Sequence, residues 1–244
     1  MSQISIIARR ELASYFATPT PYIFIVIFLI LNGICTFYLG NFYERDQADL
    51  APFFSFHPWL YLLLVPAISM RIWSEERKTG TIELLMTLPV SLWQAVLGKF
   101  FAAWLFISLA VALTFPIWLT VNYLGTPDNG AIVTAYLASI LMAGGFLAIG
   151  CCISAASQNQ VVAFIISLTA CFAMLLAGTP MVLDFFSTWA PNLFISAIAN
   201  LSFLTHFNNL SKGVIELSDL SYFLLVIICW LYATTILLDL KKAD

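Results

Sequence analysis

Long apolar stretches alternate with short polar ones along most of this chain. Six stretches are predominantly apolar over about the length that crosses the ~30 Å hydrocarbon core of a bilayer, which is about 20 helical residues. They cover residues 22–43, 53–73, 99–124, 131–154, 161–178 and 220–238. The pattern predicts an all-α integral membrane protein with six transmembrane helices, folded as a single transmembrane domain over residues 1–244.

Residues 2–17 form a leader that is too polar to cross the membrane. Apolar residues recur in it at helical spacing, and polar residues fall mostly on the other side. The apolar set is Ile4, Ile7, Leu12 and Phe16; the polar set is Arg9, Arg10, Glu11 and Ser14. This pattern predicts an amphipathic helix on the membrane surface, with Arg9 and Arg10 toward anionic lipid. A loose leader is the alternative.

The stretch before the last predicted span, residues 180–207, is apolar but interrupted. Pro180, Asp184, Pro191 and Asn192 divide it into pieces too short to cross the bilayer. Such pieces can dip into the membrane and return where protein or water satisfies the broken backbone. We therefore predict two short re-entrant or interfacial helices on the extracytoplasmic side. One additional span over residues 189–207 is the alternative.

Composition supports membrane insertion, because 61% of the residues are hydrophobic and only 9% are charged. Soluble domains usually carry about 25% charged residues. The composition therefore excludes a soluble enzyme. It indicates that lipid covers most of the surface and that nucleic acid is not a partner. The five cysteines lie in apolar stretches without metal-ligand spacing, so we interpret them as packing residues. Gly144, Gly145 and Gly150 lie in a predicted span and indicate close helix packing.

The placement of lysine and arginine predicts the orientation. In the six-span arrangement one side carries Arg9, Arg10, Arg71, Arg77, Lys78, Lys99, Lys241 and Lys242. The other side carries only Arg45 and Lys212. Positively charged loops remain in the cytoplasm, so both termini are expected there.

The loop between the second and third predicted spans concentrates charge. Residues 75–93 include a charged run followed by an apolar one, with Gly80 between them and Pro89 after them. Gly80 can end the preceding helix in a left-handed conformation, and a short helix on the membrane surface would follow. Such a helix suits docking of a soluble partner. Spacing alone does not distinguish this from a solvated connector. The candidate docking residues are Glu75, Glu76, Arg77, Lys78, Gly80, Thr81, Ile82, Glu83, Leu84, Leu85 and Met86.

This loop also carries a family resemblance. The run from Glu75 to Leu85 (EERKTGTIELL), followed by Pro89 and Gly98-Lys99, resembles permeases of ABC transporters of the type V exporter class. It is most similar to the gliding-motility-associated permeases. The leader sequence ARREL, the PxPY that follows it, residues 55–58 and the sequence PAISMR add to the similarity in the first half. The second half resembles the family mainly in the order of its spans.

The resemblance implies a function and a set of partners. The chain would be the permease subunit of an exporter or mechanotransmitter in a bacterial cytoplasmic membrane. Residues 80–88 would correspond to the coupling helix that docks on a separate ABC ATPase, and ATP and Mg²⁺ would bind to that ATPase. A second permease subunit, identical or related, and an extracytoplasmic accessory protein are further implied partners.

The chain itself lacks the phosphate-binding sequence G-x-x-x-x-G-K-[S/T], so we expect no nucleotide site, cofactor or catalytic activity of its own. Two other functions remain open. An ion-coupled secondary transporter usually places ionisable residues inside the membrane, and the centres of the predicted spans have none. A non-transporting scaffold of an assembly machinery would share all these features. His57 and His206 lack a helical acidic partner, which argues against an intramembrane enzyme.

Overall fold

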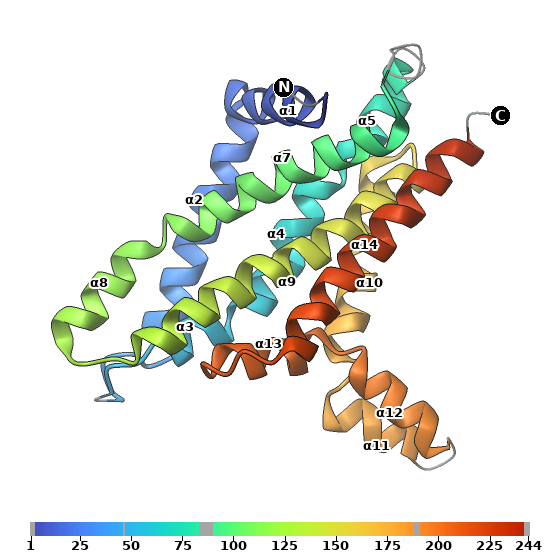
Figure 1. Ribbon diagram of the computed structural model, residues 1–244. Coiled ribbons are helices and arrows are strands. Elements are labelled where there is room, and N and C mark those ends of the chain that lie inside the picture. The colour runs from blue at the N-terminus through green and yellow to red at the C-terminus, as the bar shows by residue number, and fades with distance from the viewer. Residues whose placement is uncertain (1–2, 46, 83–89, 188–190, 242–244) are drawn as a thin grey trace.

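The computed structural model describes residues 3–45, 47–82, 90–187 and 191–241. These parts of the chain are helical and contain no strand. Figure 1 shows an elongated bundle in which α1, the end of α5 and the end of α14 lie at the same end. The helices are α1 (Gln3–Ala17), α2 (Pro19–Ile34), the π-helical turn η1 (Cys35–Leu39), α3 (Ala51–Ser55), α4 (His57–Ser69), α5 (Arg71–Thr79), α7 (Leu92–Ala112), α8 (Phe115–Leu124), α9 (Asn129–Ala156), α10 (Gln160–Leu176), α11 (Pro180–Ser187), α12 (Asn192–Asn200), α13 (Phe203–Ser211) and α14 (Leu217–Leu240).

Four helices in the described residues are long and apolar enough to cross a membrane. They are Pro19–Leu39, Leu92–Leu124, Asn129–Ala156 and Leu217–Leu240. A fifth is possible if Gln160–Leu176 and Pro180–Ser187, which meet at a bend of 77°, are taken as one broken span. The structure therefore establishes a multi-span helical protein with four or five candidate spans, fewer than the six that the sequence predicts.

Besides this bent pair, the difference lies in the second predicted span, residues 53–73, which forms three helices rather than one. The chain breaks at Phe56 and at Met70, between α3, α4 and α5. Pro58 occupies the first turn of α4, where proline is favoured, and Pro66 lies inside α4, where it cannot donate a backbone hydrogen bond. α4 alone has 13 residues, or about 20 Å of helix, which is short of the hydrocarbon core.

The third predicted span also differs, at both ends of α7. Helix α7 begins at Leu92, before the predicted start at residue 99, and ends at Ala112. Ser91 caps its first turn: the Ser91 hydroxyl accepts from Gln94 N, and the Gln94 side chain accepts from Ser91 N. Pro116 lies in the first turn of α8, which continues the span after the break. The early start places Lys99 in the second turn of a helix rather than at its edge.

Helix α9 is the centre of the bundle, packed against α4, α7, α10, α13 and α14. Side chains of neighbouring helices pack closely against its glycines, as the sequence predicts. A Cβ on Gly145 would lie 2.5 Å from Phe203 Cε1, and one on Gly144 would lie 2.9 Å from Trp104 Nε1. Gly150 is in similarly close contact with Ser69. Close packing at these three positions is therefore confirmed.

Residues 180–207 contain more helices than predicted. α11 and α12 contact each other and project away from the bundle in Figure 1, whereas a third short helix, α13, packs on α9. α13 starts at Phe203, inside the predicted pair, and buries Phe203 and Phe207. Neither α12 nor α13 exceeds nine residues, or about 14 Å, so neither crosses a bilayer alone.

Candidate functional site

The candidate site begins where α5 leaves the bundle. Gly80 follows α5 with φ 73° and ψ 4°, the left-handed conformation that the sequence predicts. Arg77 and Lys78 occupy the last turn of α5, where cations interact favourably with the helix dipole. A Cβ at Gly80 would meet no heavy atom within 4 Å, so a side chain there costs backbone strain rather than a clash.

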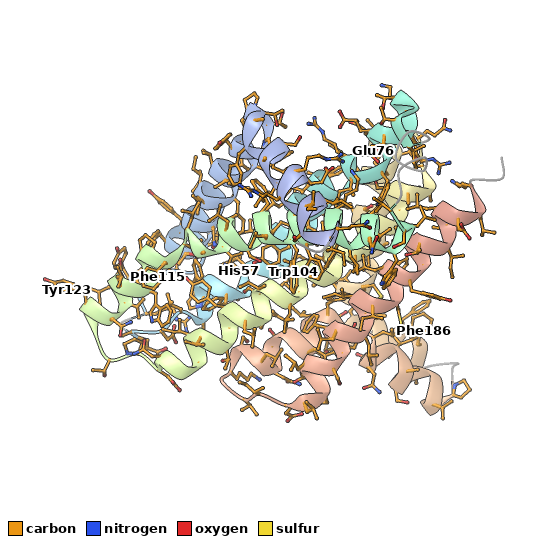
Figure 2. The ribbon with its side chains drawn as sticks, turned by 45° about the horizontal axis from the view of Figure 1, so that its top comes forward. His57, Glu76, Trp104, Phe115, Tyr123 and Phe186 are labelled. Atoms are coloured by element: carbon orange, nitrogen blue, oxygen red, sulfur yellow. The ribbon has the colours of Figure 1, made fainter. Side chains whose placement is uncertain are left out.

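One buried lysine joins this end of α5 to two other helices. Lys99 Nζ, on α7, lies 2.7 Å from Glu76 Oε1 on α5 and 3.4 Å from Glu11 Oε2 on α1. The Lys99 side chain is 5% exposed, and both glutamates are 21% exposed. The ammonium also lies 5.2 Å from the centre of the Trp73 ring, within cation–π range. We call these four residues the Lys99 junction. Figure 2 shows Glu76 at the end of the molecule where α1 lies.

A second set of bonds ties α5 to the end of α9. Arg77 donates to the carbonyl of Ala155, and Lys241, after α14, donates to the carbonyl of Ala156. These are carbonyls at the C-terminus of α9, which has no intrahelical donor for them. The ends of α5, α9 and α14 are therefore held together by two cations.

The Ser154 side chain forms hydrogen bonds with backbone groups at the break between α4 and α5. Its hydroxyl accepts from the backbone N–H groups of Trp73 and Ser74, each at 3.1 Å, and donates to Met70 O at 2.9 Å. Trp73 is fully buried and its indole N–H donates to Cys151 Sγ. Since buried polar groups without partners are costly, these bonds fix the direction in which α5 leaves the bundle.

Helix α1 lies against the start of α7. Ile7 fills the space beside Gly98, where a Cβ would lie 2.7 Å from an Ile7 methyl carbon. Tyr15 stacks on Phe106 with ring centres 5.3 Å apart. Burial, and secondly the charge of Glu11, raises the pKa of the Tyr15 hydroxyl, which therefore stays protonated. α1 is thus a packed part of the molecule and not a loose leader.

A family model described as "ABC-2 family transporter protein" matches residues 5–238 of the chain. The chain belongs to the ABC-2 transporter family. Comparison with curated protein sequences finds no match. Membership makes this chain a multi-pass membrane permease of an ABC transporter, a class that works with an ABC ATPase subunit.

The predicted docking residues of the permease divide into two groups. Glu76 and Arg77 turn inward to Lys99 and Ala155, whereas Glu75, Lys78 and the short Thr81 side chain are exposed. Ile82 is partly buried against the core. Glu83, Leu84, Leu85 and Met86 lie outside the described residues, so the predicted coupling helix itself is not described. Arg9 and Arg10 are exposed on α1, and Arg10 pairs with Glu11.

Two features of the junction were missed from the sequence. Glu11 was assigned to the polar, lipid-facing side of the leader, but it lies on the packed side of α1, one turn from Ile7, and contacts Lys99. Lys99 was counted as a loop cation, but it is buried in α7. The sequence did contain one usable signal: the Ser91-x-x-Gln94 capping box marks the true start of α7.

The two histidines of the permease also have partners that the sequence did not indicate. His206 Nδ1 lies 2.5 Å from Asp219 Oδ1, and Nε2 lies 3.0 Å from the carbonyl of Asn200, the last residue of α12. His206 therefore has an acidic partner that helical spacing does not indicate, since Asp219 lies on a different helix. The pair joins α13 to the start of α14 and holds the end of α12.

His57 is completely buried. Asn32 Nδ2 lies 3.0 Å from His57 Nε2, and Ser139 Oγ lies 2.8 Å from Nδ1. Because an amide N–H can only donate, Nε2 accepts and Nδ1 carries the proton that Ser139 accepts. His57 therefore connects α2, α4 and α9 as a neutral hydrogen-bonding group.

Proposed function

We propose that this chain is the transmembrane permease subunit of a type V ABC exporter or mechanotransmitter, related to the gliding-motility permeases. In this proposal residues 75–93 dock on a separate ATPase, and ATP-driven movement enters the bundle through the Lys99 junction. ATP and Mg²⁺ bind to the ATPase, and this chain contributes no catalytic group.

The observation that carries the proposal is the way the charged segment is anchored. A loop that only connected two spans would need no buried ion pair. Here Glu76 contacts a lysine that is 5% exposed, and Arg77 contacts the end of the central helix. A force applied beyond Gly80 is therefore transmitted to α7, α1 and α9 together. Exposed Glu75 and Lys78 remain available to a partner, where rim charges set orientation and register.

The proposal includes six crossings with both termini in the cytoplasm of a bacterial cell. The three consecutive helices α3, α4 and α5 would together supply the crossing that α4 is too short to make alone. The positions of charge support the orientation. Arg77 and Lys241 contact one end of α9, whereas Asp128 caps the other end. Lysine and arginine near the first end would face the cytoplasm.

A second permease subunit completes the proposed complex, as a homodimer or with a related chain. Several helices leave apolar side chains uncovered, including Ile23 and Ile30 on α2 and Leu225 and Ile228 on α14. Closed two-fold pairing is the commonest arrangement of oligomers. Lipid would cover the remaining apolar surface, and the projecting α11–α12 hairpin is a candidate contact for an extracytoplasmic accessory protein.

The test is co-purification with the ABC ATPase and the ATPase rate of the complex in lipid discs. Gly80→Val should impair coupling, because a β-branched residue resists the positive φ that Gly80 adopts. Glu83→Lys should weaken association or uncouple hydrolysis, since removing one partner of a buried charged contact costs about 2–5 kcal/mol. If both variants bind the ATPase and couple like the parent, residues 75–93 are only a connector.

The matched control reverses a charge at the opposite end of the molecule. Asp128 is unsuitable, because its side chain accepts from Gly130 N and Ala131 N and caps α9. Glu44 is exposed and forms no side-chain hydrogen bond with the residues that the structure describes. Glu44→Lys should therefore leave both ATPase association and the ATPase rate unchanged.

A further inference from the structure

A pocket of about 250 Å³ lies beside the Lys99 junction, between α1, α2, α5 and α7. Its lining is polar on one side and apolar on the other. The polar side includes Arg71, Glu75 and the hydroxyl residues Ser14, Thr18 and Thr20. The apolar side includes Phe24, Ala67, Ile68 and Phe106. A ligand that fills this pocket must be amphipathic.

The apolar side of the pocket adjoins a groove between α2 and α4. The groove is lined entirely by apolar residues and has a volume of about 80 Å³. Phe24 and Ala67 line both the pocket and the groove, so the two lie next to each other. The rim of the groove is open on the outer surface of the bundle, where Ile27 is 41% and Leu63 is 52% exposed. The groove therefore faces the apolar part of a membrane.

Some of the charged side chains that line the pocket form ion pairs and others do not. Lys99 and Glu11 satisfy each other, and Glu76 Oε1 also contacts Lys99. Arg71 and Glu75 are exposed and form no side-chain ion pair with any residue that the structure describes, although both charges act on Tyr15. One guanidinium and one carboxylate are thus available to a ligand, one turn apart on α5.

Glu76 retains a further unused acceptor. Its Oε2 is buried and has no hydrogen-bond partner among the described residues, while Oε1 holds Lys99. A buried carboxylate oxygen without a donor is costly.

From these features we propose that the pocket and groove bind one membrane phospholipid with a phosphate and a primary ammonium, of the phosphatidylethanolamine type. The phosphate lies against Arg71 and the nearby hydroxyls, because guanidinium recognises phosphate in a bidentate manner. The ammonium donates to Glu75 and to the free oxygen of Glu76. One acyl chain leaves along the groove between α2 and α4.

The membrane, rather than the aqueous phase, is the source of this ligand. A soluble phosphate compound would use the polar side of the pocket but leave Phe24 and the adjoining groove in contact with lipid. A bound phospholipid contacts α1, α2, α4 and α5 at once, so it would strengthen the attachment of α1 to the bundle. This inference concerns binding only and does not depend on coupling to an ATPase.

The experiment is native mass spectrometry of the full chain, delipidated in mild detergent and titrated with three lipids that share the same acyl chains. Phosphatidylethanolamine should bind about tenfold more tightly than phosphatidylcholine, whose quaternary ammonium donates no hydrogen bond. It should also bind more tightly than phosphatidylglycerol, which has no cation. Equal binding of all three lipids, or tighter binding of phosphatidylglycerol, would overturn the proposal.

Three variants locate the site. Glu75→Gln should remove the preference for phosphatidylethanolamine over phosphatidylcholine, and Arg71→Gln should weaken both. Ala67→Phe, at the point shared by pocket and groove, should block binding, whereas Ile165→Phe, on the exposed face of α10, should not. Thermal unfolding without added lipid confirms that each variant is folded. An unchanged lipid preference in folded Glu75→Gln and Ala67→Phe would show that the lipid binds elsewhere.

Discussion

Replacing Lys99 with methionine perturbs the junction while keeping an apolar stem of similar length. The change leaves Glu76 and Glu11 without the cation that lies 2.7 Å and 3.4 Å from their oxygens. Breaking a fully buried ion pair costs about 3–5 kcal/mol. Both glutamates keep 21% exposure, so water solvates part of the orphaned charge. We therefore expect Lys99→Met to lower the free energy of unfolding by about 2 kcal/mol.

The assay is thermal unfolding in mild detergent, followed by tryptophan fluorescence, to which buried Trp73 beside Lys99 should contribute. For a chain of this size, about 2 kcal/mol corresponds to a fall in Tm of about 4–8 °C. The matched control is Lys212→Met, because Lys212 is exposed at the other end of α9. Such a surface change should stay within about 0.5 kcal/mol.

A double-mutant cycle separates the ion pair from general packing. Adding Glu76→Gln to Lys99→Met removes one orphaned charge, so the double variant should be more stable than the sum of the single losses predicts. Residues in direct contact show interaction energies of about 0.5–3 kcal/mol. If Lys99→Met unfolds at the same temperature as Lys212→Met, or if the losses add, the junction does not stabilise the end of α5.

Two further predictions concern packing and the membrane surface. Gly145→Leu should prevent correct folding, because even a Cβ at this position would lie 2.5 Å from Phe203. Gly33→Leu should fold, because a Cβ there would meet no heavy atom within 4 Å. The yield of monodisperse protein in detergent measures the difference, and equal yields would contradict close packing at α9. Replacing exposed Arg9 and Arg10 with glutamate should reduce the amount of correctly inserted protein, since each change loses about 1 kcal/mol of attraction to anionic lipid. Protease accessibility in membrane vesicles measures the inserted fraction. An unchanged fraction would refute a role for α1 at the membrane surface.

Local features of the fold followed from the sequence where the cause was local. Gly80 lies between two segments that can be helical. Because glycine adopts the left-handed conformation more easily than other residues, its role in ending α5 was predictable. The leader helix was likewise predictable from its periodicity, and Pro19 and Pro21 mark its end. The close contacts at Gly144, Gly145 and Gly150 followed from small residues in an apolar span.

The Lys99 junction could not be predicted, because its partners are distant in the sequence. A lysine at the start of an apolar stretch is normally placed in water by the positive-inside rule. Only the packing of α1 across α7 brings Glu11 to Lys99, and only the path of α5 brings Glu76 there. The break between α4 and α5 is stabilised by Ser154, a residue of α9, whose hydroxyl accepts from the backbone N–H groups of Trp73 and Ser74.

The most direct test of the central claim is site-specific photocrosslinking in the intact complex. A photoreactive amino acid replaces Lys78, which is exposed at the end of α5 next to the segment that we expect to dock. The same residue at Glu44, exposed at the other end of the molecule, is the control. The account predicts a crosslink from position 78 to the ABC ATPase and none from position 44. A folded complex in which position 44 crosslinks to the ATPase and position 78 does not would contradict it.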